Sequence, residues 1–135
     1  LMKDFCKHSK QNTPYTEAEI VRMIYESLAL KYRLALEEIQ ECTGKIYHTI
    51  YMLGGGIQSK LLCQMTADAT NCKVVAGPVE ATTYGNLLIQ LLATKELKDL
   101  KEARNLIRKS CPLEVYLPTQ TREWKDAFLR FQNII

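Results

Sequence analysis

Apolar side chains recur at the three- and four-residue spacing of a helix through most of the chain. The second such stretch begins with a capping-box pattern, Thr16 and Glu19, and ends before Gly44, a suitable residue just past a helix. At roughly 1.5 Å per residue this helix would be long enough to cross a domain. Its apolar residues spread over more than one stripe, so we expect it to be covered on two sides. The spacing predicts helices over residues 1–10, 17–42, 59–70, 79–93, 95–109 and 121–135.

Two stretches have the pattern of buried strands instead. Residues 46–53 are rich in β-branched, aromatic and large apolar side chains, and residues 73–76 read Lys-Val-Val-Ala. With helix 59–70 between them, these stretches predict a βαβ unit whose strands pair in parallel through a right-handed crossover. Residues 113–118 are expected to form a short extended connector. Two short strands make a small sheet for so many helices, because parallel sheets are normally buried among further strands.

The last helices carry further structural signals. Pro78 suits the first position of helix 79–93, and Glu80 in the first turn suits the helix dipole. Gly85 costs that helix about 1 kcal/mol, and we interpret it as a point where another backbone packs closely. In helix 121–135 the apolar face predicts that the single tryptophan docks the helix on the core. That face consists of Trp124, Phe128, Phe131 and Ile135.

Three successive glycines follow the first predicted strand. Gly54, Gly55 and Gly56 precede a helix that begins at Ser59, and a strand, a glycine turn and a helix N-terminus can together present backbone N–H groups to a nucleotide. A plain tight turn explains three glycines equally well. The segment is no dinucleotide fingerprint, since its third glycine would fall at Ser59, and no P-loop, since no glycine precedes Lys60. The residues alone indicate part of a nucleotide site.

Composition narrows the functional classes. The chain has 135 residues, the size of one domain, and a net charge of +3, too small to suggest a nucleic-acid or membrane partner. Its five cysteines are widely spaced, which fits buried thiols in a reducing cytoplasm better than disulfides or zinc. Neither His8 nor His48 belongs to a catalytic or metal-ligand pattern, so we assign no catalytic residue and no metal site. Gln64 and Asp68 share a helix face, where a local hydrogen bond is a simpler interpretation than a ligand.

Four segments in combination resemble the C-terminal domain of the FGGY carbohydrate kinases. Within that family, the wording of the last segment is most similar to members that phosphorylate L-rhamnulose. The resemblance covers most of the chain and weakens after about residue 95. The segments are Glu26-Ser-Leu-Ala-Leu-Lys-Tyr32, Leu53-Gly-Gly-Gly-Ile-Gln-Ser59, Gln64-Met-Thr-Ala-Asp68 and Val75-Ala-Gly-Pro-Val-Glu-Ala-Thr-Thr-Tyr-Gly85.

The resemblance implies an α/β fold of the actin-like, ribonuclease-H-like ATPase class, with ATP, Mg and a sugar bound between two domains. It implies that Gly55 contacts the nucleotide through its backbone, that Gly54 and Gly56 permit the approach, and that Ser59 lies near the adenine. Residues 80–85 would pack against the strand ends. The phosphate would pass to the 1-hydroxyl of L-rhamnulose in the cytoplasm.

Residues 1–135 are then expected to be a single partial domain. The N-terminal domain, the sugar site and the catalytic Asp would lie upstream of Leu1, so the chain alone is expected to be inactive. Its unpaired sheet edges could pair with a second copy. Two alternatives stay open: a kinase of the same family for a xylulose- or fuculose-like sugar, or a non-catalytic interaction module that retains part of the fold.

Overall fold

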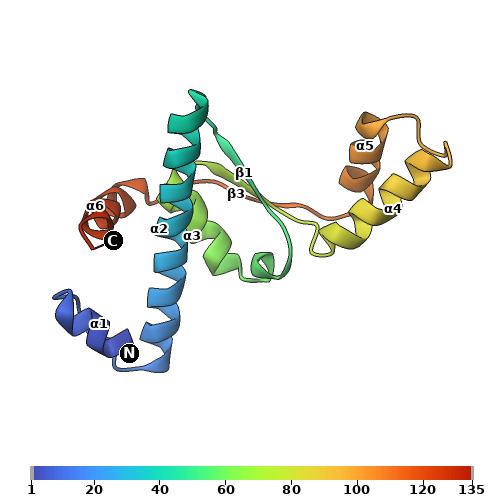
Figure 1. Ribbon diagram of the computed structural model, residues 1–135. Coiled ribbons are helices and arrows are strands. Elements are labelled where there is room, and N and C mark those ends of the chain that lie inside the picture. Colours follow the sequence, from blue (N-terminus) through green and yellow to red (C-terminus); the bar gives the residue numbers. More distant parts are fainter. Residues whose placement is uncertain (1, 135) are drawn as a thin grey trace.

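The structure is a computed structural model that describes residues 2–134 (Figure 1). Helices dominate it, and three short strands form one sheet. In chain order the elements are α1 (Met2–His8), α2 (Glu17–Thr43), β1 (Thr49–Met52), the 3-10 helix η1 (Gly55–Gln58), α3 (Lys60–Thr70), β2 (Lys73–Ala76), α4 (Ala81–Ala93), α5 (Leu100–Ser110), β3 (Glu114–Tyr116) and α6 (Thr121–Gln132).

The long helix α2 confirms its predicted signals. The Thr16 hydroxyl accepts from the Glu19 N–H at 3.2 Å, the Glu19 carboxylate accepts from the Thr16 N–H at 3.0 Å, and Gly44 ends the helix at φ 63°. The expected coverage on two sides holds only near its middle, where Ala29 and Leu30 are buried. Elsewhere apolar side chains such as Ile39 remain exposed, because α3 and α6 reach only the central turns.

The sheet has three strands in the order β1-β2-β3, one more than the sequence predicted. Strand β1 pairs in parallel with β2, with Thr49 opposite Lys73, so the βαβ unit is confirmed. Strand β3 pairs antiparallel with β2, with Val75 opposite Val115, so the expected connector is extended as predicted, but residues 114–116 of it form a sheet strand that was not predicted. Strand β3 has three residues, too few to show an alternating pattern in the sequence.

Two apolar clusters hold together the sheet, η1 and the helices α2, α3 and α6, which we call the body. One joins α2, α3 and α6, and it contains Trp124, which confirms that the tryptophan docks the last helix; Ile135 lies outside the described residues. The other lies between α3 and the sheet and consists of Cys63, Ala67, Val74 and Ala76. Ile57 of η1 packs against this second cluster, so the glycine segment is anchored to the core.

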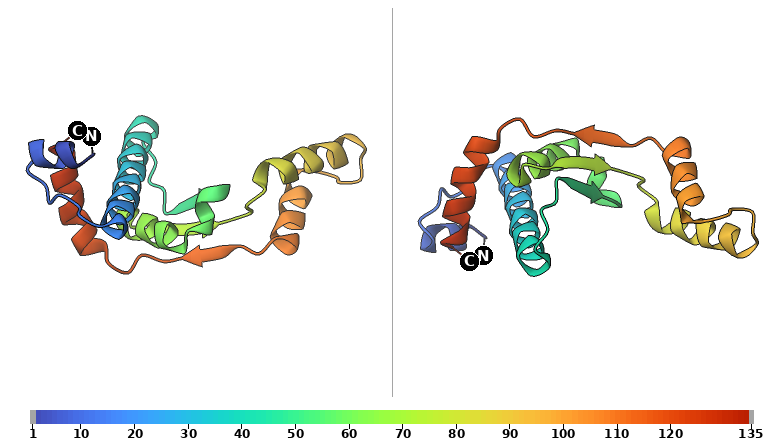
Figure 2. Two further views of the ribbon diagram at one scale, coloured as in Figure 1. Left: turned by 90° about the horizontal axis from the view of Figure 1, so that it is seen from below. Right: turned by 90° about the horizontal axis from the view of Figure 1, so that it is seen from above.

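Helices α4 and α5 lie apart from the body, at the end of two extended segments, and we call this pair the arm (Figures 1 and 2). Helix α4 contacts α5 and has no buried residue among those described. The predicted packing of residues 80–85 against the strand ends is therefore wrong for this chain. A Cβ at Gly85 would meet no atom within 4 Å, so the close backbone approach predicted there is also wrong.

The start of α4 also differs from its prediction. Pro78 follows Gly77 through a cis peptide and lies before the helix, whose N-cap is Glu80, so neither residue has its expected place in the first turn. Helix α5 begins at Leu100, later than predicted, because Asp99 caps it by accepting from the Glu102 N–H at 2.8 Å. Within residues 2–134 no helix combines the length and the apolar character needed to cross a membrane.

Candidate functional site

Gly55 and Gly56 lie in the short 3-10 helix η1, and Gly54 is the N-cap that precedes it. Gly54 has φ 81°, a conformation that favours glycine, and its carbonyl accepts from the Ile57 N–H at 3.3 Å. The Gly56 carbonyl accepts from the Ser59 N–H, also at 3.3 Å. We call residues 54–59 the glycine turn. Its compact shape brings the end of β1 directly to the start of α3.

Gly55 and Gly56 differ from Gly54 in what the chain requires of them. Neither has a positive φ, and a Cβ on either would meet no atom within 4 Å. Both residues are exposed. The conformation and packing of this chain therefore accept any small side chain at these two positions. Their missing side chains leave an open backbone surface at the tip of the turn.

Ser59 has a structural role in the chain itself. Its hydroxyl oxygen accepts from the Leu62 N–H at 3.3 Å and so caps α3. A hydroxyl can also donate one hydrogen bond, and that proton is not used in the cap. Ser59 can therefore cap the helix and still offer a donor to a bound molecule.

The side chain of Cys63 binds the backbone of the glycine turn. This side chain is fully buried, and its thiol donates to the Ile57 carbonyl at 3.7 Å. Burial raises the pKa of the Cys63 thiol, and the nearby Glu114 carboxylate raises it further. The thiol consequently stays protonated and remains a donor at neutral pH.

Two polar side chains of β3, Glu114 and Tyr116, lie near Lys60 at the start of α3. The Lys60 ammonium is 3.3 Å from the Glu114 carboxylate, which also accepts a hydrogen bond from the Tyr116 hydroxyl. The Tyr116 bond, followed by the Lys60 bond, lowers the pKa of Glu114. The same bond to Glu114 raises the pKa of Tyr116 to about 12. Sequence reasoning missed these residues because Glu114 lies far from Lys60 in the chain and no local motif joins them.

The other residues singled out in the sequence are not gathered at the turn. Gln64 donates to Asp68 at 3.1 Å, which confirms the local hydrogen bond. Asp68 is buried, and it also accepts a hydrogen bond from the backbone N–H of Thr119 at 2.6 Å. Its carboxylate therefore binds groups of the chain itself. His48 is exposed. In the part of the chain that the structure describes, no group of three or more His, Cys, Asp or Glu side chains could hold a metal ion.

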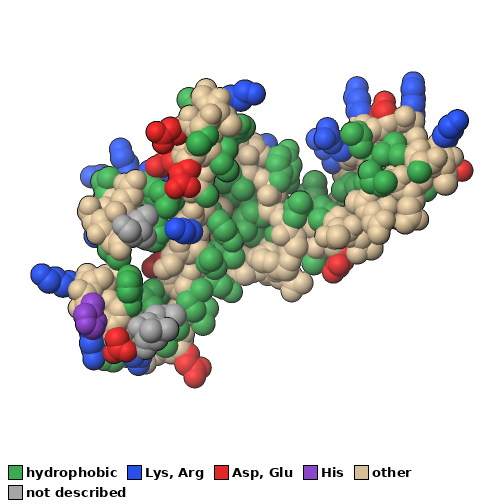
Figure 3. Space-filling view, viewed as in Figure 1, with side chains coloured by type: hydrophobic (Ala, Val, Ile, Leu, Met, Phe, Trp, Pro, Cys, Tyr) green, Lys and Arg blue, Asp and Glu red, His purple; other side chains and the backbone are tan. Residues whose placement is uncertain are grey.

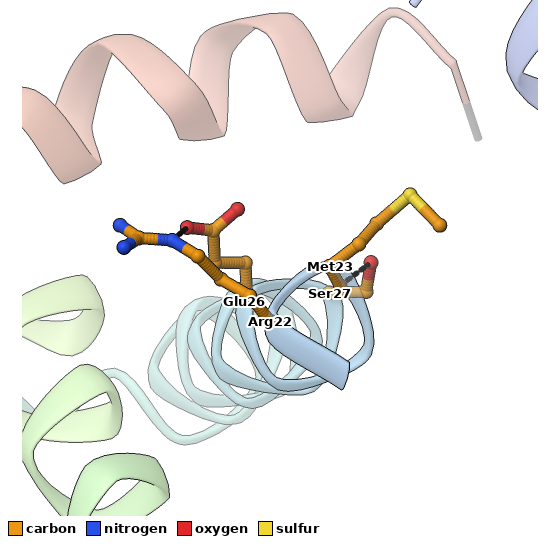
Figure 4. Close-up of polar contacts among 4 residues, drawn as sticks. All are labelled: Arg22, Met23, Glu26 and Ser27. Carbon is orange, nitrogen blue, oxygen red and sulfur yellow. Dashed lines mark hydrogen bonds and ion pairs between the residues drawn. The ribbon is translucent and has the colours of Figure 1, made fainter. Parts of the chain in front are cut away.

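Two grooves lie elsewhere on the body. A groove of about 470 Å³ separates α2 from α3 and α6, and the paired side chains of Arg22 and Glu26 line it. Figure 4 shows this pair, 2.7 Å apart, beside Met23 and Ser27 on α2. A more apolar groove of about 560 Å³ runs between α2 and β1, and Gly56 of the glycine turn is among its lining residues. Hydrophobic side chains gather over this part of the surface in Figure 3.

Comparison with known proteins agrees with the resemblance in the sequence. Residues 3–94 match the family model of the C-terminal domain of the FGGY family of carbohydrate kinases. A rhamnulokinase from Bacteroides thetaiotaomicron is 39% identical over 99% of this chain and 28% of its own length. The rhamnulokinase of Bacillus subtilis is 41% identical over 87% of this chain and 24% of its own length.

A third relative, the rhamnulokinase of Enterococcus faecalis, is 43% identical over 85% of this chain and 24% of its own length. The chain spans about a quarter of the length of these relatives. The glycine turn lies inside the matched residues, whereas β3 and α6 lie beyond them. The chain belongs to the FGGY family of carbohydrate kinases and matches the C-terminal domain of that family.

Proposed function

We propose that this chain forms one side of the ATP site of a sugar kinase, and that the whole kinase transfers phosphate from Mg-ATP to the 1-hydroxyl of L-rhamnulose. The family match supports the phosphotransferase class. The relatives named rhamnulokinase support this ketose over a xylulose- or fuculose-like sugar. The βαβ unit that carries the turn is compatible with an actin-like ATPase domain.

The open backbone surface at Gly55 and Gly56 carries the nucleotide half of this proposal. Nothing within the described chain needs a glycine at either position. Glycine is nevertheless the residue that lets another molecule approach a backbone most closely. We infer that Gly55 contacts the nucleotide through its backbone, that Gly54 sets the shape of the turn, that Gly56 keeps the surface open, and that the Ser59 hydroxyl donates to the nucleotide.

The remaining parts of the reaction belong to the rest of the proposed kinase. Phosphoryl transfer depends on positioning the phosphates and on a residue that orients or activates the sugar hydroxyl. We place that residue, the sugar site and the second wall of the cleft outside these 135 residues. In this arrangement Mg arrives with the ATP phosphates, and the chain alone is inactive. We place the kinase in the cytoplasm, with which the free cysteines are compatible.

Steady-state kinetics of the natural gene product that contains this chain test both halves of the proposal. We expect ATP-dependent turnover that is faster with L-rhamnulose than with L-fuculose or D-xylulose. Gly55→Ala should raise the KM for ATP by about tenfold or more and leave the KM for the ketose unchanged, because only the nucleotide contact is obstructed. Gly85→Ala is the matched control at a second glycine with open space, on the arm, and should leave the KM for ATP unchanged.

Each result bears on a separate part of the proposal. A preference for another ketose would overturn the substrate and retain the kinase. An unchanged KM for ATP in Gly55→Ala would overturn the nucleotide site. A gene product with no kinase activity on any ketose would favour the non-catalytic interaction module. Turnover of L-rhamnulose by the 135-residue chain alone would contradict the placement of the catalytic group outside it.

A further inference from the structure

One face of α3 is bound to residues 114–120, which comprise β3 and the segment that leads from it to α6, and which we call the strap. Lys60, Gln64 and Asp68 are spaced four residues apart, so they lie on one face of the helix at successive turns. Each binds the strap, and the partners follow the same order along the chain. Those partners are Glu114, Leu117, Thr119 and Gln120.

Asp68 makes the most extensive of these contacts. Its Oδ1 atom accepts from the N–H of Thr119 at 2.6 Å, from the Thr119 hydroxyl at 3.2 Å and from the N–H of Gln120 at 3.2 Å. The side chain is only 5% exposed. A buried carboxylate is tolerated when hydrogen bonds satisfy it, and removing it leaves the donors unpaired in the interior. Asp68 therefore fixes the strap at the C-terminal end of the helix.

The contacts weaken toward the N-terminal end of α3 but continue to it. Gln64 donates to the Leu117 carbonyl at 2.8 Å, and Lys60 is 3.3 Å from Glu114. The Lys60 pair is exposed on both sides, so it contributes little energy by itself. The pair matters because of its position: Lys60 directly follows Ser59, the last residue of the glycine turn.

The strap also reaches the turn through the core. Tyr116 of β3 packs against the apolar cluster between α3 and the sheet, and Ile57 of the glycine turn packs against the same cluster. Tyr116 lies opposite Val74 in the sheet. A shift of the strap along α3 would therefore disturb two anchors of the turn, Ile57 in the core and Ser59 at the start of α3.

We propose that Asp68 and Gln64 are positioning residues that hold α3 in register with the strap and thereby keep the glycine turn in the shape that accepts a nucleotide. This inference rests on the proposed ATP site. It assigns a role in that site to residues 114–120, which lie beyond the part of the chain that matches the family model.

The test compares Asp68→Ala, Asp68→Asn and Gln64→Ala in the natural gene product. Asp68→Ala should raise the KM for ATP roughly tenfold to a hundredfold, since small displacements of a binding group have effects of this size. The KM for the ketose should not change. Asp68→Asn keeps an oxygen acceptor and should restore most of the affinity. Asp126→Ala, which removes an exposed carboxylate on α6, is the control and should resemble the unmodified protein.

Amide hydrogen exchange on the same variants separates positioning from general destabilisation. In Asp68→Ala, exchange at residues 54–59 should accelerate by about tenfold or more relative to the buried strand β2. Uniform acceleration, or equal KM values for ATP in all variants, would overturn the inference. Gln64→Ala, at a half-buried position, keeps the test open if Asp68→Ala fails to fold. If Gly55→Ala impairs ATP use and these variants do not, the strap role fails and the proposed site stands.

Discussion

The glycines of this chain differ in what makes each of them necessary. Gly77 has φ 120°, and a Cβ there would lie 3.1 Å from the Leu113 side chain and 3.1 Å from the Pro112 carbonyl, so both backbone and packing require glycine. Gly55, Gly56 and Gly85 have neither constraint within the chain. Gly85 lies inside a helix, whereas Gly55 and Gly56 lie in an exposed turn between a strand and a helix, where a glycine without an internal cause points to contacts beyond the chain. For Gly55 and Gly56, that reasoning supports the proposed nucleotide contact.

Gly85→Ala should stabilise α4 in the 135-residue chain. The glycine lies inside the helix with open space around it, and alanine there reduces the entropy of the unfolded state, for a gain of about 0.5–1 kcal/mol. Slower amide hydrogen exchange across α4 would measure the gain. Gly77→Ala is the contrast, because its φ and its close neighbours should make alanine destabilising. An unstable α4 in Gly85→Ala would contradict the open surroundings seen here.

The hydroxyl of Tyr116 should titrate well above the ordinary pKa of a tyrosine. Its folded pKa of about 12 exceeds the ordinary value of about 10, because the neutral hydroxyl donates to Glu114 and a tyrosinate would face that carboxylate. The stabilising contribution is therefore fully present below pH 10 and is lost as the pH rises toward 12. Glu114→Gln should move the pKa of Tyr116 back toward 10.

The ultraviolet absorbance of tyrosinate in an alkaline titration measures this shift, because Tyr116 contributes one of the seven tyrosine signals of the chain. Glu123→Gln, which changes an exposed carboxylate on α6, is the control and should titrate like the unmodified chain. Superimposable curves for Glu114→Gln and the control would refute the assigned bond between Tyr116 and Glu114.

At the scale of elements, sequence patterns predicted correctly those helix ends and strands that depend on a few neighbouring residues. The capping box at Thr16, the αL residues Gly44 and Asn71, and the strand 73–76 are all encoded within a few residues, and the structure confirms them. Strand β3 depends instead on pairing with β2 across the fold, so three residues carried no usable signal. The role of Asp68 was likewise hidden, because its partners lie 51 and 52 residues away.

The glycine turn shows the same division. Its position between a strand and a capped helix follows from the local sequence, and its ligand follows only from the resemblance to a family. Helix α4 is a case in which the sequence pattern failed. Its apolar composition predicted a helix packed against the core, and no residue described in it is buried. Among the described elements its main contact is with α5, and local sequence cannot say which surface a helix covers.

The docking of α6 on α2 should depend on Phe128. The side chain is 2% exposed, and the Arg33 guanidinium lies over its ring at 4.1 Å from the ring centre. Phe128→Ala removes this packing and should lower the free energy of unfolding by about 3–5 kcal/mol in urea denaturation. Leu129→Ala, one residue along and 55% exposed, should change it by well under half that amount. Equal effects of the two variants would mean that α6 is not docked as described.

The whole molecule has a body and an outlying arm (Figure 2). Exposed apolar side chains lie on the body beside β1 and on α4. Within the described chain, β1 and β3 are the two edges of the sheet. Charged side chains commonly protect such edges. Strand β1 carries none, and Tyr51 on it is 65% exposed. Leu53 beyond the strand and Ile39 on α2 extend the same apolar surface.

The isolated chain should therefore self-associate through the β1 edge as its concentration rises. An unpaired strand beside an apolar groove offers both hydrogen bonds and buried area to a second copy. Tyr51→Lys places a charge on that edge and should weaken association by about tenfold or more in sedimentation velocity. Val115→Lys makes the same change on the other edge strand, β3, where the residue is 57% exposed, and should have little effect. A chain that stays monomeric at all concentrations would rule out the association, and weakening by Val115→Lys alone would move it to β3.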